Sequence, residues 1–278
     1  MLRRRFLACL AAAALAAPAL AAAPASAAGH FIVVASTTST QDSGLYEYLL
    51  PIFTQRTGIE VRVVAKGTGE AIRLAEHGDA DVLLVHDTKA EEAFVAAGYG
   101  VRRYPLMYND FVIVGPASDP AGIKGTRDAP AALAAIVDGK NLFVSRGDDS
   151  GTNRAEMRLW LESGVNPKTL SNYYYWSTGS GMGQTLNTAA AMGAYTLSDR
   201  ATWVAFKNKR DLALMVQGDP RLYNQYGVTL VNPRRFPHVN AADGQAFIDW
   251  LVSPEGQRTI AGFRVDGQQL FVPNAGGF

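Results

Sequence analysis

A polar loop whose residue types suit the binding of an anion lies near the middle of the chain. It runs from Ser145 to Thr152 and reads Ser-Arg-Gly-Asp-Asp-Ser-Gly-Thr. Arg146 brings a fixed positive charge and a forked set of donors, and Ser150 and Thr152 add hydroxyl groups. The stretch contains no histidine, cysteine or lysine. These residues predict a loop that holds an oxyanion and does not attack it.

The elements on either side place this loop at the start of a helix. The apolar run 141–144 predicts a buried strand before the loop, and a helical pattern extends from about Asn153 to Ser163 after it. At such a junction the backbone N–H groups and the helix dipole both point outward and favour a negative ligand.

Two further polar corners occupy the same kind of strand-to-helix junction, at 36–40 and at 67–69. Each corner alone has the ordinary composition of a helix cap. Three corners of small residues can instead bring many backbone amides close to one shared ligand. Five or six hydrogen bonds to a charged oxygen, at roughly 1.5–3 kcal/mol each, suffice for sub-micromolar binding, even after subtraction of the free energy needed to close the protein around the ligand.

Strands and helices alternate from the start of the exported chain. Apolar strand runs at 31–35, 59–64 and 81–85 are separated by helical patterns. The first helix repeats apolar residues at the spacing of one helix face, with Leu45, Tyr48, Leu49, Ile52 and Phe53. This β-α-β-α-β order predicts a mostly parallel, doubly wound α/β sheet with ligands at the carboxyl ends of its strands.

Two later segments, 107–114 and 222–231, each place Tyr-Asn ahead of an apolar strand that is followed by a proline turn. One interpretation is a pair of strands that links two lobes. Residues 28–114 then begin the first lobe, 115–225 form an inserted second lobe, and 226–278 complete the first. The other interpretation is that two core strands share the same turn chemistry.

Residues 1–27 are typical of a secretory signal peptide. Arg3, Arg4 and Arg5 form its basic region, a short Ala/Leu-rich core follows, and Ala25-Ser26-Ala27 is an A-x-A cleavage site. The core is too short for a membrane span. Cleavage after Ala23 is an alternative, and the arginines also resemble a twin-arginine signal, so Sec and twin-arginine export both stay open. We therefore expect a periplasmic protein.

Composition excludes several classes of protein. The only cysteine, Cys9, lies in the signal region, so no disulfide is expected in the mature chain. With 26 basic and 25 acidic side chains the net charge of the chain is only +1, which argues against nucleic acid or an anionic membrane as partner. No metal-ligand spacing links the histidines His30, His77, His86 and His238, so we expect no metal site. We also expect a monomer without a cofactor.

Four motifs carry a family resemblance that extends over nearly all of the mature chain. They are 36–45, 78–87, 107–116 and 145–152. Together they resemble the tungstate-binding (TupA-type) solute-binding proteins of ABC transporters. The resemblance implies a type II periplasmic binding protein fold, in which two doubly wound α/β lobes are joined by a two-strand hinge. It also implies that the protein hands an oxyanion to the permease subunits of an ABC transporter.

The same resemblance implies that both lobes contribute to the oxyanion site, through Thr38, Ser39, Thr68, Arg146, Ser150, Gly151 and Thr152. Tyr195 corresponds to a position where molybdate-binding relatives place a tyrosine near the anion, although a satisfied core tyrosine is the alternative. Asn153 stands where relatives often carry histidine, a change that alters the support of the loop and leaves its donors in place.

Three residues near these motifs have two readings each. Either Asp148 or Asp149 orients Arg146 or caps the helix while pointing away from the ligand, or both are solvated turn residues. His86 follows a strand and is either a donor to the anion or an ordinary structural histidine.

Enzyme motifs are absent from the sequence. No G-x-S-x-G surrounds Ser150, and neither a phosphate-loop lysine motif nor H-E-x-x-H occurs. The remaining enzymatic alternative is a secreted phosphoester hydrolase that uses Arg146 with Asp148 or Asp149. We expect instead a non-catalytic receptor for tungstate. Molybdate, of nearly the same size and charge, is the first alternative, followed by sulfate and by phosphate, which needs an acceptor for its proton.

Overall fold

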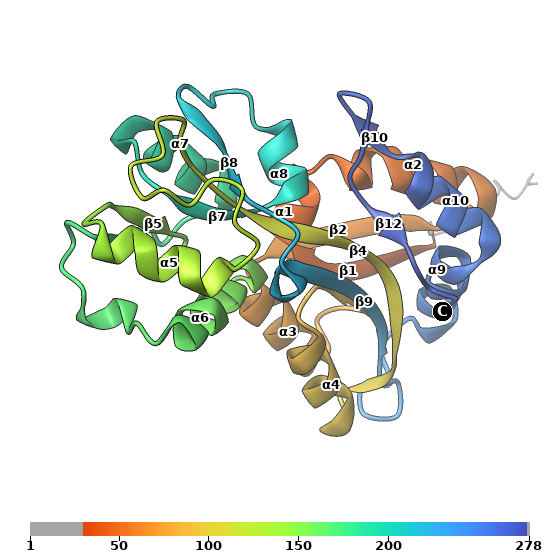
Figure 1. Cartoon of the computed structure of the whole chain (residues 1–278). Coiled ribbons are helices and arrows are strands. Elements are labelled where there is room, and N and C mark those ends of the chain that lie inside the picture. The colour runs from red at the N-terminus through yellow and green to blue at the C-terminus, as the bar shows by residue number, and fades with distance from the viewer. Residues whose placement is uncertain (1–29, 277–278) are drawn as a thin grey trace, which may run out of the picture.

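The computed structural model describes residues 30–276 as a mixed α/β protein. Figure 1 shows one long strand, β4 (Gly100–Pro116), running through the middle of the molecule between two groups of elements. One group carries helices α5, α6 and α7, and the other carries α2, α9 and α10. The signal peptide predicted for 1–27 lies outside the described residues. Within residues 30–276, no helix combines the length and the apolar character needed to cross a bilayer.

The main sheet has eight strands, in the order β12-β4-β9-β3-β1-β2, with β7 and β8 also paired to β4. Its other strands are β1 (Phe31–Thr37), β2 (Glu60–Lys66), β3 (Val82–Val85), β7 (Thr196–Asp199), β8 (Leu212–Val216), β9 (Tyr223–Val231) and β12 (Val272–Pro273). Two small sheets add β5 (Phe143–Ser145) beside β6 (Tyr175–Ser177), and β10 (Arg264–Val265) beside β11 (Gln268–Gln269).

The helices follow the strands as the alternating pattern predicted. They are α1 (Thr38–Asp42), α2 (Leu45–Thr57), α3 (Thr68–His77), α4 (Thr88–Ala96), α5 (Ala129–Asp138), α6 (Gly151–Ser163), α7 (Met182–Met192), α8 (Arg200–Ala205), α9 (Ala241–Val252) and α10 (Pro254–Gly262). Short 3₁₀ turns lie at Pro167–Thr169 and Pro220–Leu222.

The prediction of a mostly parallel sheet is right for three strands and wrong for the rest. Strand β1 pairs in parallel with β2 and β3. Strand β9, which comes from late in the chain, is inserted between β3 and β4 and runs antiparallel to both. Strands β7, β8 and β12 also pair antiparallel with β4. No local pattern in the first three βα units reports that a later strand separates β3 from β4.

The two Tyr-Asn segments form neighbouring strands. In the β4–β9 ladder, Asn109 lies opposite Asn224 and Tyr108 lies opposite Gln225. Residues 100–110 of β4 pair with β9, whereas residues 111–116 pair with β7 and β8. Strand β4 therefore belongs to both groups of elements, and β9 runs beside it where the groups meet.

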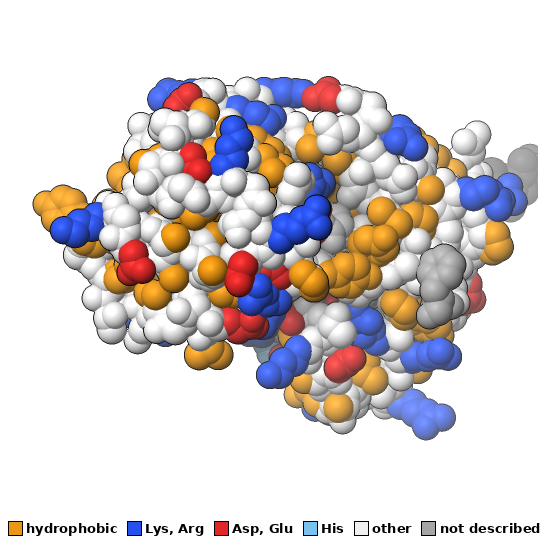
Figure 2. Space-filling view, viewed as in Figure 1, with side chains coloured by type: hydrophobic (Ala, Val, Ile, Leu, Met, Phe, Trp, Pro, Cys, Tyr) orange, Lys and Arg blue, Asp and Glu red, His pale blue; other side chains and the backbone are white. Residues whose placement is uncertain are grey.

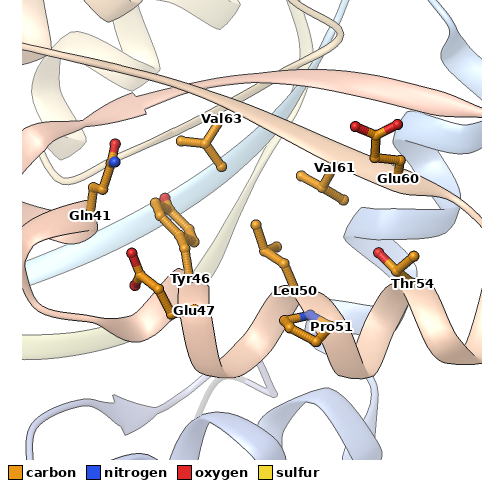
Figure 3. A pocket seen from close by; sticks show the side chains of 9 residues that line it. All are labelled: Gln41, Tyr46, Glu47, Leu50, Pro51, Thr54, Glu60, Val61 and Val63. Atoms are coloured by element: carbon orange, nitrogen blue, oxygen red, sulfur yellow. The ribbon is translucent and has the colours of Figure 1, made fainter.

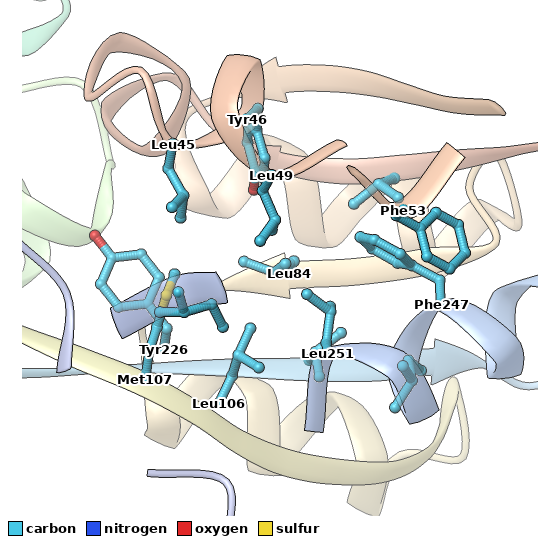
Figure 4. Close-up of a cluster of buried hydrophobic side chains, with 14 of the residues drawn as sticks. Leu45, Tyr46, Leu49, Phe53, Leu84, Leu106, Met107, Tyr226, Phe247 and Leu251 are labelled. Atoms are coloured by element: carbon cyan, nitrogen blue, oxygen red, sulfur yellow. The ribbon is translucent and has the colours of Figure 1, made fainter. Parts of the chain in front are cut away.

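Separate apolar clusters stabilise the two groups. Figure 4 shows side chains of α2, β3, β4, β9 and α9 pointing toward one another, among them Phe53, Leu84, Met107, Tyr226 and Phe247. In α2 the predicted face is buried at Leu45, Leu49 and Phe53, while Tyr48 is 40% exposed. The other group is built around a second set that includes Ile113, Phe143, Leu159, Trp160 and Leu197.

Candidate functional site

The three polar corners form the starts of α1, α3 and α6, and these starts lie against one another. The Gly69 amide nitrogen lies 3.4 Å from the Asp149 carbonyl oxygen, which brings α3 to the loop before α6. A methyl group at Gly151 would lie 3.0 Å from Thr68 Oγ1 and 2.5 Å from His86 Cε1. His86 in turn reaches α1, because its Nε2 lies 3.3 Å from Ser39 Oγ. The first N–H groups of a helix have no partner within the helix, so the amide donors of three helix starts are brought together here.

Three of the predicted side chains carry buried polar atoms that find no hydrogen-bond partner within residues 30–276: Thr68 Oγ1, Arg146 Nη1 and Thr152 Oγ1. All three residues are 1% exposed or less. A buried polar group left unpaired costs about 1–3 kcal/mol, and native proteins hold few of them. Thr68 begins α3, whereas Arg146 and Thr152 flank the start of α6, so these three atoms come from both sides of the Gly151 contact.

Arg146 is oriented by the loop that contains it. Its Nη2 and Nε donate to Asp148 Oδ2 at 2.6 and 3.2 Å, which leaves Nη1 as the free end of the guanidinium. Asp148 Oδ1 also accepts from the Ser150 amide at 3.3 Å. Asp149 turns outward and accepts from Arg154 at 2.8 and 2.9 Å. The geometry thus gives Asp148 the orienting role that the sequence left open between the two aspartates.

A buried carboxyl supports the same loop from the protein interior. Glu156 accepts from Ser145 Oγ at 2.7 Å, from Tyr175 Oη at 2.8 Å and from Trp160 Nε1 at 3.0 Å. Burial raises the pKa of Glu156 to about 7, against these hydrogen bonds. Asn153 donates to Ser145 Oγ at 3.3 Å and accepts from the Asp149 amide at 3.2 Å, so it ties the start of the loop to its middle.

The remaining predicted residues lie at the helix starts. Ser150 caps α6 by accepting from the Asn153 amide at 3.2 Å. Thr37 caps α1 in the same way through the Thr40 amide at 3.3 Å, and Thr38 and Ser39 follow as the first residues of the helix. Ser39 is 2% exposed, and Thr38 is half-buried.

Comparison with known proteins places this architecture. Residues 21–255 match the PBP superfamily domain. The tungstate-binding protein TupA of Peptoclostridium acidaminophilum is 48% identical over 248 residues, which cover 88% of this chain and 86% of that protein. This chain belongs to the TupA family of periplasmic binding proteins.

Solved structures of TupA-family members share the fold. The tungstate-binding protein TupA from Desulfovibrio alaskensis G20 aligns with a TM-score of 0.77 at 45% identity, over 88% of this chain and 99% of that one. The tungstate ABC transporter protein from Geobacter sulfurreducens aligns with a TM-score of 0.76 at 46% identity, over 84% and 98% of the two chains. One is named as a tungstate-binding protein and the other as a tungstate ABC transporter, and the shared fold is the mixed α/β periplasmic binding protein fold.

One predicted residue of this TupA-family chain is not brought to the convergence point. The Tyr195 hydroxyl donates to Asp119 Oδ1 and accepts from the Ala121 amide, both at 3.0 Å. Its ring packs against Gly115 within the second apolar cluster. The side chain of Tyr195 is therefore a satisfied core tyrosine, the alternative that the sequence left open.

Asp199, which the sequence did not identify, is a buried carboxyl whose charge interacts with that of Arg146. Asp199 is 1% exposed and caps α8 through the Thr202 amide at 2.8 Å, and its Oδ2 has no hydrogen-bond partner among the residues that the structure describes. Burial raises its pKa, and the charge of Arg146 opposes that shift. Asp199 ends β7 and precedes α8, so it occupies a fourth strand-to-helix junction of the kind that marked the other three corners.

A separate pocket between α2 and β2, of about 440 Å³, does not suit an anion (Figure 3). Two glutamates, Glu47 and Glu60, line it, and no lysine or arginine does. On the face drawn in Figure 2, basic and acidic side chains are interspersed over both groups of elements. Within residues 30–276, no cluster of three or more His, Cys, Asp or Glu side chains could hold a metal ion.

Proposed function

We propose that this protein captures tungstate where α1, α3 and α6 meet and delivers it to an ABC transporter permease. The observation that carries the proposal is the set of buried, unpartnered donors on Thr68, Arg146 and Thr152. Thr38, Ser39, Ser150 and Gly151 complete the proposed binding set from the same helix starts. Relatives named for tungstate binding, at 37–48% identity over most of the chain, support the choice of ligand.

The donor set matches the charge of the ligand. Tungstate is a tetrahedral dianion that carries no proton at neutral pH, so every oxygen can accept a hydrogen bond. Backbone amides, the unpartnered hydroxyls of Thr68 and Thr152 and one guanidinium supply donors without adding more than one positive charge. Molybdate differs little in size and charge, and the titration below ranks the two ions.

We propose that the two groups of elements described above are the two lobes, or halves, of the protein. Residues 28–114 and 226–278 form the first half, and residues 115–225 form the second. Strands β4 and β9 then act as the hinge. Asp87 of the first lobe lies 3.6 Å from Arg154 and 3.5 Å from Arg158 of the second, which is a closed arrangement. An anion that contacts both lobes favours this closed form by its differential affinity. The protein acts as a periplasmic monomer exported by its signal peptide.

Calorimetric titration of the mature protein with tungstate, molybdate, sulfate and phosphate tests the proposal. We expect sub-micromolar binding of tungstate and weaker binding of sulfate and phosphate. Tight binding of sulfate or phosphate without tungstate would overturn the ligand, and turnover of a chromogenic phosphate ester that depends on Arg146 would overturn the receptor function.

A further inference from the structure

A buried chain of hydrogen-bonded side chains connects the paired strands β4 and β9 to the start of α1. Asn224 Nδ2 donates to Asn109 Oδ1 at 2.7 Å. Asn224 Oδ1 lies 2.9 Å from His86 Nδ1, and His86 Nε2 lies 3.3 Å from Ser39 Oγ. Each of the four residues is 5% exposed or less. The two asparagines belong to the two Tyr-Asn segments and lie opposite each other in the ladder.

The chemistry of these groups fixes the direction of the hydrogens along the chain. Asn224 uses its NH₂ group toward Asn109, so it offers only its oxygen to His86. His86 Nδ1 must therefore carry a hydrogen. Burial lowers the pKa of His86 to about 4, so the ring is neutral at neutral pH and Nε2 holds a lone pair. The Ser39 hydroxyl then donates to His86 Nε2.

The ring of His86 also forms part of the contact between the halves. One face stacks on Tyr226 with centroids 4.8 Å apart. Gly151 at the start of α6 approaches so closely that a methyl group there would lie 2.5 Å from His86 Cε1. The charged groups that act on the ring are Arg146 and Arg158 from the second half and Asp87 from its own strand end. The orientation of one ring thus affects α1 and α6 together.

We propose that His86 is a positioning residue that links the oxyanion site to the hinge. The Asn109–Asn224 pair fixes its tautomer and its plane, and the ring then sets the direction of the Ser39 hydroxyl and the surface on which Gly151 closes. Because the asparagine pair spans the two strands that connect the halves, bending of those strands is transmitted to the ring. The inference about affinity rests on the proposed oxyanion function, whereas the tautomer can be measured without any ligand.

Replacement of Asn224 by Asp gives a readout that a purely structural role would not move. A carboxylate bonded to Nδ1 raises the pKa of His86, so the ring becomes protonated as the pH falls toward 6. Nε2 then donates to Ser39, the hydroxyl hydrogen is released toward the anion, and the site gains positive charge. Glu156 titrates in the same range in both proteins. We therefore expect the tungstate affinity of Asn224→Asp to rise about tenfold more than that of the wild type between pH 8 and 6, equivalent to one charged hydrogen bond.

The matched control is Gln225→Glu, the same change of charge on the next residue of β9. Gln225 bonds to the Met107 and Tyr226 carbonyl oxygens and to Asn274, and has no bond to His86. Its affinity should follow the wild-type pH profile. The same extra rise in Gln225→Glu, or a wild-type profile in Asn224→Asp, overturns the link between Asn224 and the site.

Long-range ¹H–¹⁵N NMR of the histidine rings, recorded on the ligand-free wild type at pH 7, directly tests the chain of hydrogen bonds from Asn224 through His86 to Ser39. We expect wild-type His86 to carry a hydrogen on Nδ1 and none on Nε2. In Asn224→Asp, the pH at which half of the His86 rings are protonated should coincide with the midpoint of the change in tungstate affinity. Hydrogen on Nε2 of wild-type His86 overturns the proposal. If the wild type binds none of the four oxyanions but shows the Nδ1–H tautomer, the proposed function is wrong and the positioning of His86 by Asn224 is still supported.

Discussion

At the scale of single residues, Arg146 is the side chain on which anion binding should depend most. Two of its nitrogens are held by Asp148 and the third is buried without a partner. We expect Arg146→Ala to weaken tungstate binding at least about 100-fold, the loss of two charge-assisted hydrogen bonds. Arg146→Lys should recover only a small part of this affinity. A lysine ammonium group lacks the forked set of donors by which the guanidinium group bonds Asp148 and the anion at the same time.

Calorimetry checks this prediction, with Arg56→Ala as the control. Arg56 forms a surface ion pair with Glu255 and its side chain is 62% exposed, so its loss should leave affinity unchanged. If Arg146→Ala titrates like the wild type while Arg56→Ala does too, the loop is only a helix cap and the anion binds elsewhere.

Gly151 tests the close approach of the two halves. A methyl group at this position would lie 2.5 Å from His86 Cε1, 2.8 Å from His86 Nδ1 and 3.0 Å from Thr68 Oγ1, all in buried side chains. The added group obstructs closure and has no such neighbours once the halves separate. We therefore expect Gly151→Ala to weaken tungstate binding by about tenfold or more, the effect of roughly 1.4 kcal/mol of strain confined to the closed form.

Gly183 in α7 is the matched glycine, since a methyl group there would meet nothing within 4 Å. Gly183→Ala should bind normally and gain up to about 1 kcal/mol of stability from better helix propensity. Equal affinities for the two variants, measured by calorimetry, would mean that the Gly151 contact does not form in the bound protein.

At the scale of elements, the junction of β5 and α6 should make stability depend on pH through Glu156. Its pKa is raised from 4.5 to about 7 by burial, so between these values the folded protein keeps a proton that the unfolded chain releases. The stabilising effect is complete below pH 4.5 and is lost as the pH rises through about 7. The difference corresponds to about 3 kcal/mol at most.

Urea unfolding at pH 5 and pH 8, followed by tryptophan fluorescence, measures this dependence. Glu156→Gln keeps an acceptor for Trp160 and Tyr175 and does not titrate, so its free energy of unfolding should fall less between the two pH values. Burial also raises the pKa of Glu91 to about 7, so the free energy of unfolding of both proteins keeps some dependence on pH. A slope identical to that of the wild type would show that Glu156 stays charged in the fold.

The elements were predictable where a local pattern determines them. The pattern 153–163 predicted α6, which is observed at Gly151–Ser163, and the apolar runs predicted β1, β2 and β3. Helix α1 was missed because its five residues are too short to show a helical period. The convergence of the corners was predictable from their common junction type, but the contacts of Gly151 with His86 and Thr68 depend on packing between distant segments.

At the scale of the whole molecule, long-range order was the part that sequence patterns did not determine. The two Tyr-Asn segments indicated paired strands, yet nothing local showed that β9 would separate β3 from β4. The same insertion places Asn224 beside His86, so the antiparallel arrangement that was not predicted is what connects the hinge strands to the site. The topology therefore carries functional information that the motifs alone lack.

Closure of the whole molecule should depend on Asp87, which faces Arg154 and Arg158 across the halves. Asp87→Asn keeps an acceptor for the Ala90 amide at the start of α4 but loses the charge. We expect tungstate to dissociate about fivefold faster, since an ion pair at this partly exposed boundary contributes on the order of 1 kcal/mol. The difference should shrink at high salt, because exposed charges are screened.

Stopped-flow displacement of tungstate by excess molybdate measures the dissociation rate, and small-angle X-ray scattering measures closure. Glu60→Gln is the control, since Glu60 pairs with Arg62 of the same strand at an exposed site, entirely within the first half. We expect both variants and the wild type to become more compact on binding, with only Asp87→Asn releasing the anion faster. Unchanged release from Asp87→Asn at low salt would mean that the anion alone holds the halves together and that Asp87 only caps α4.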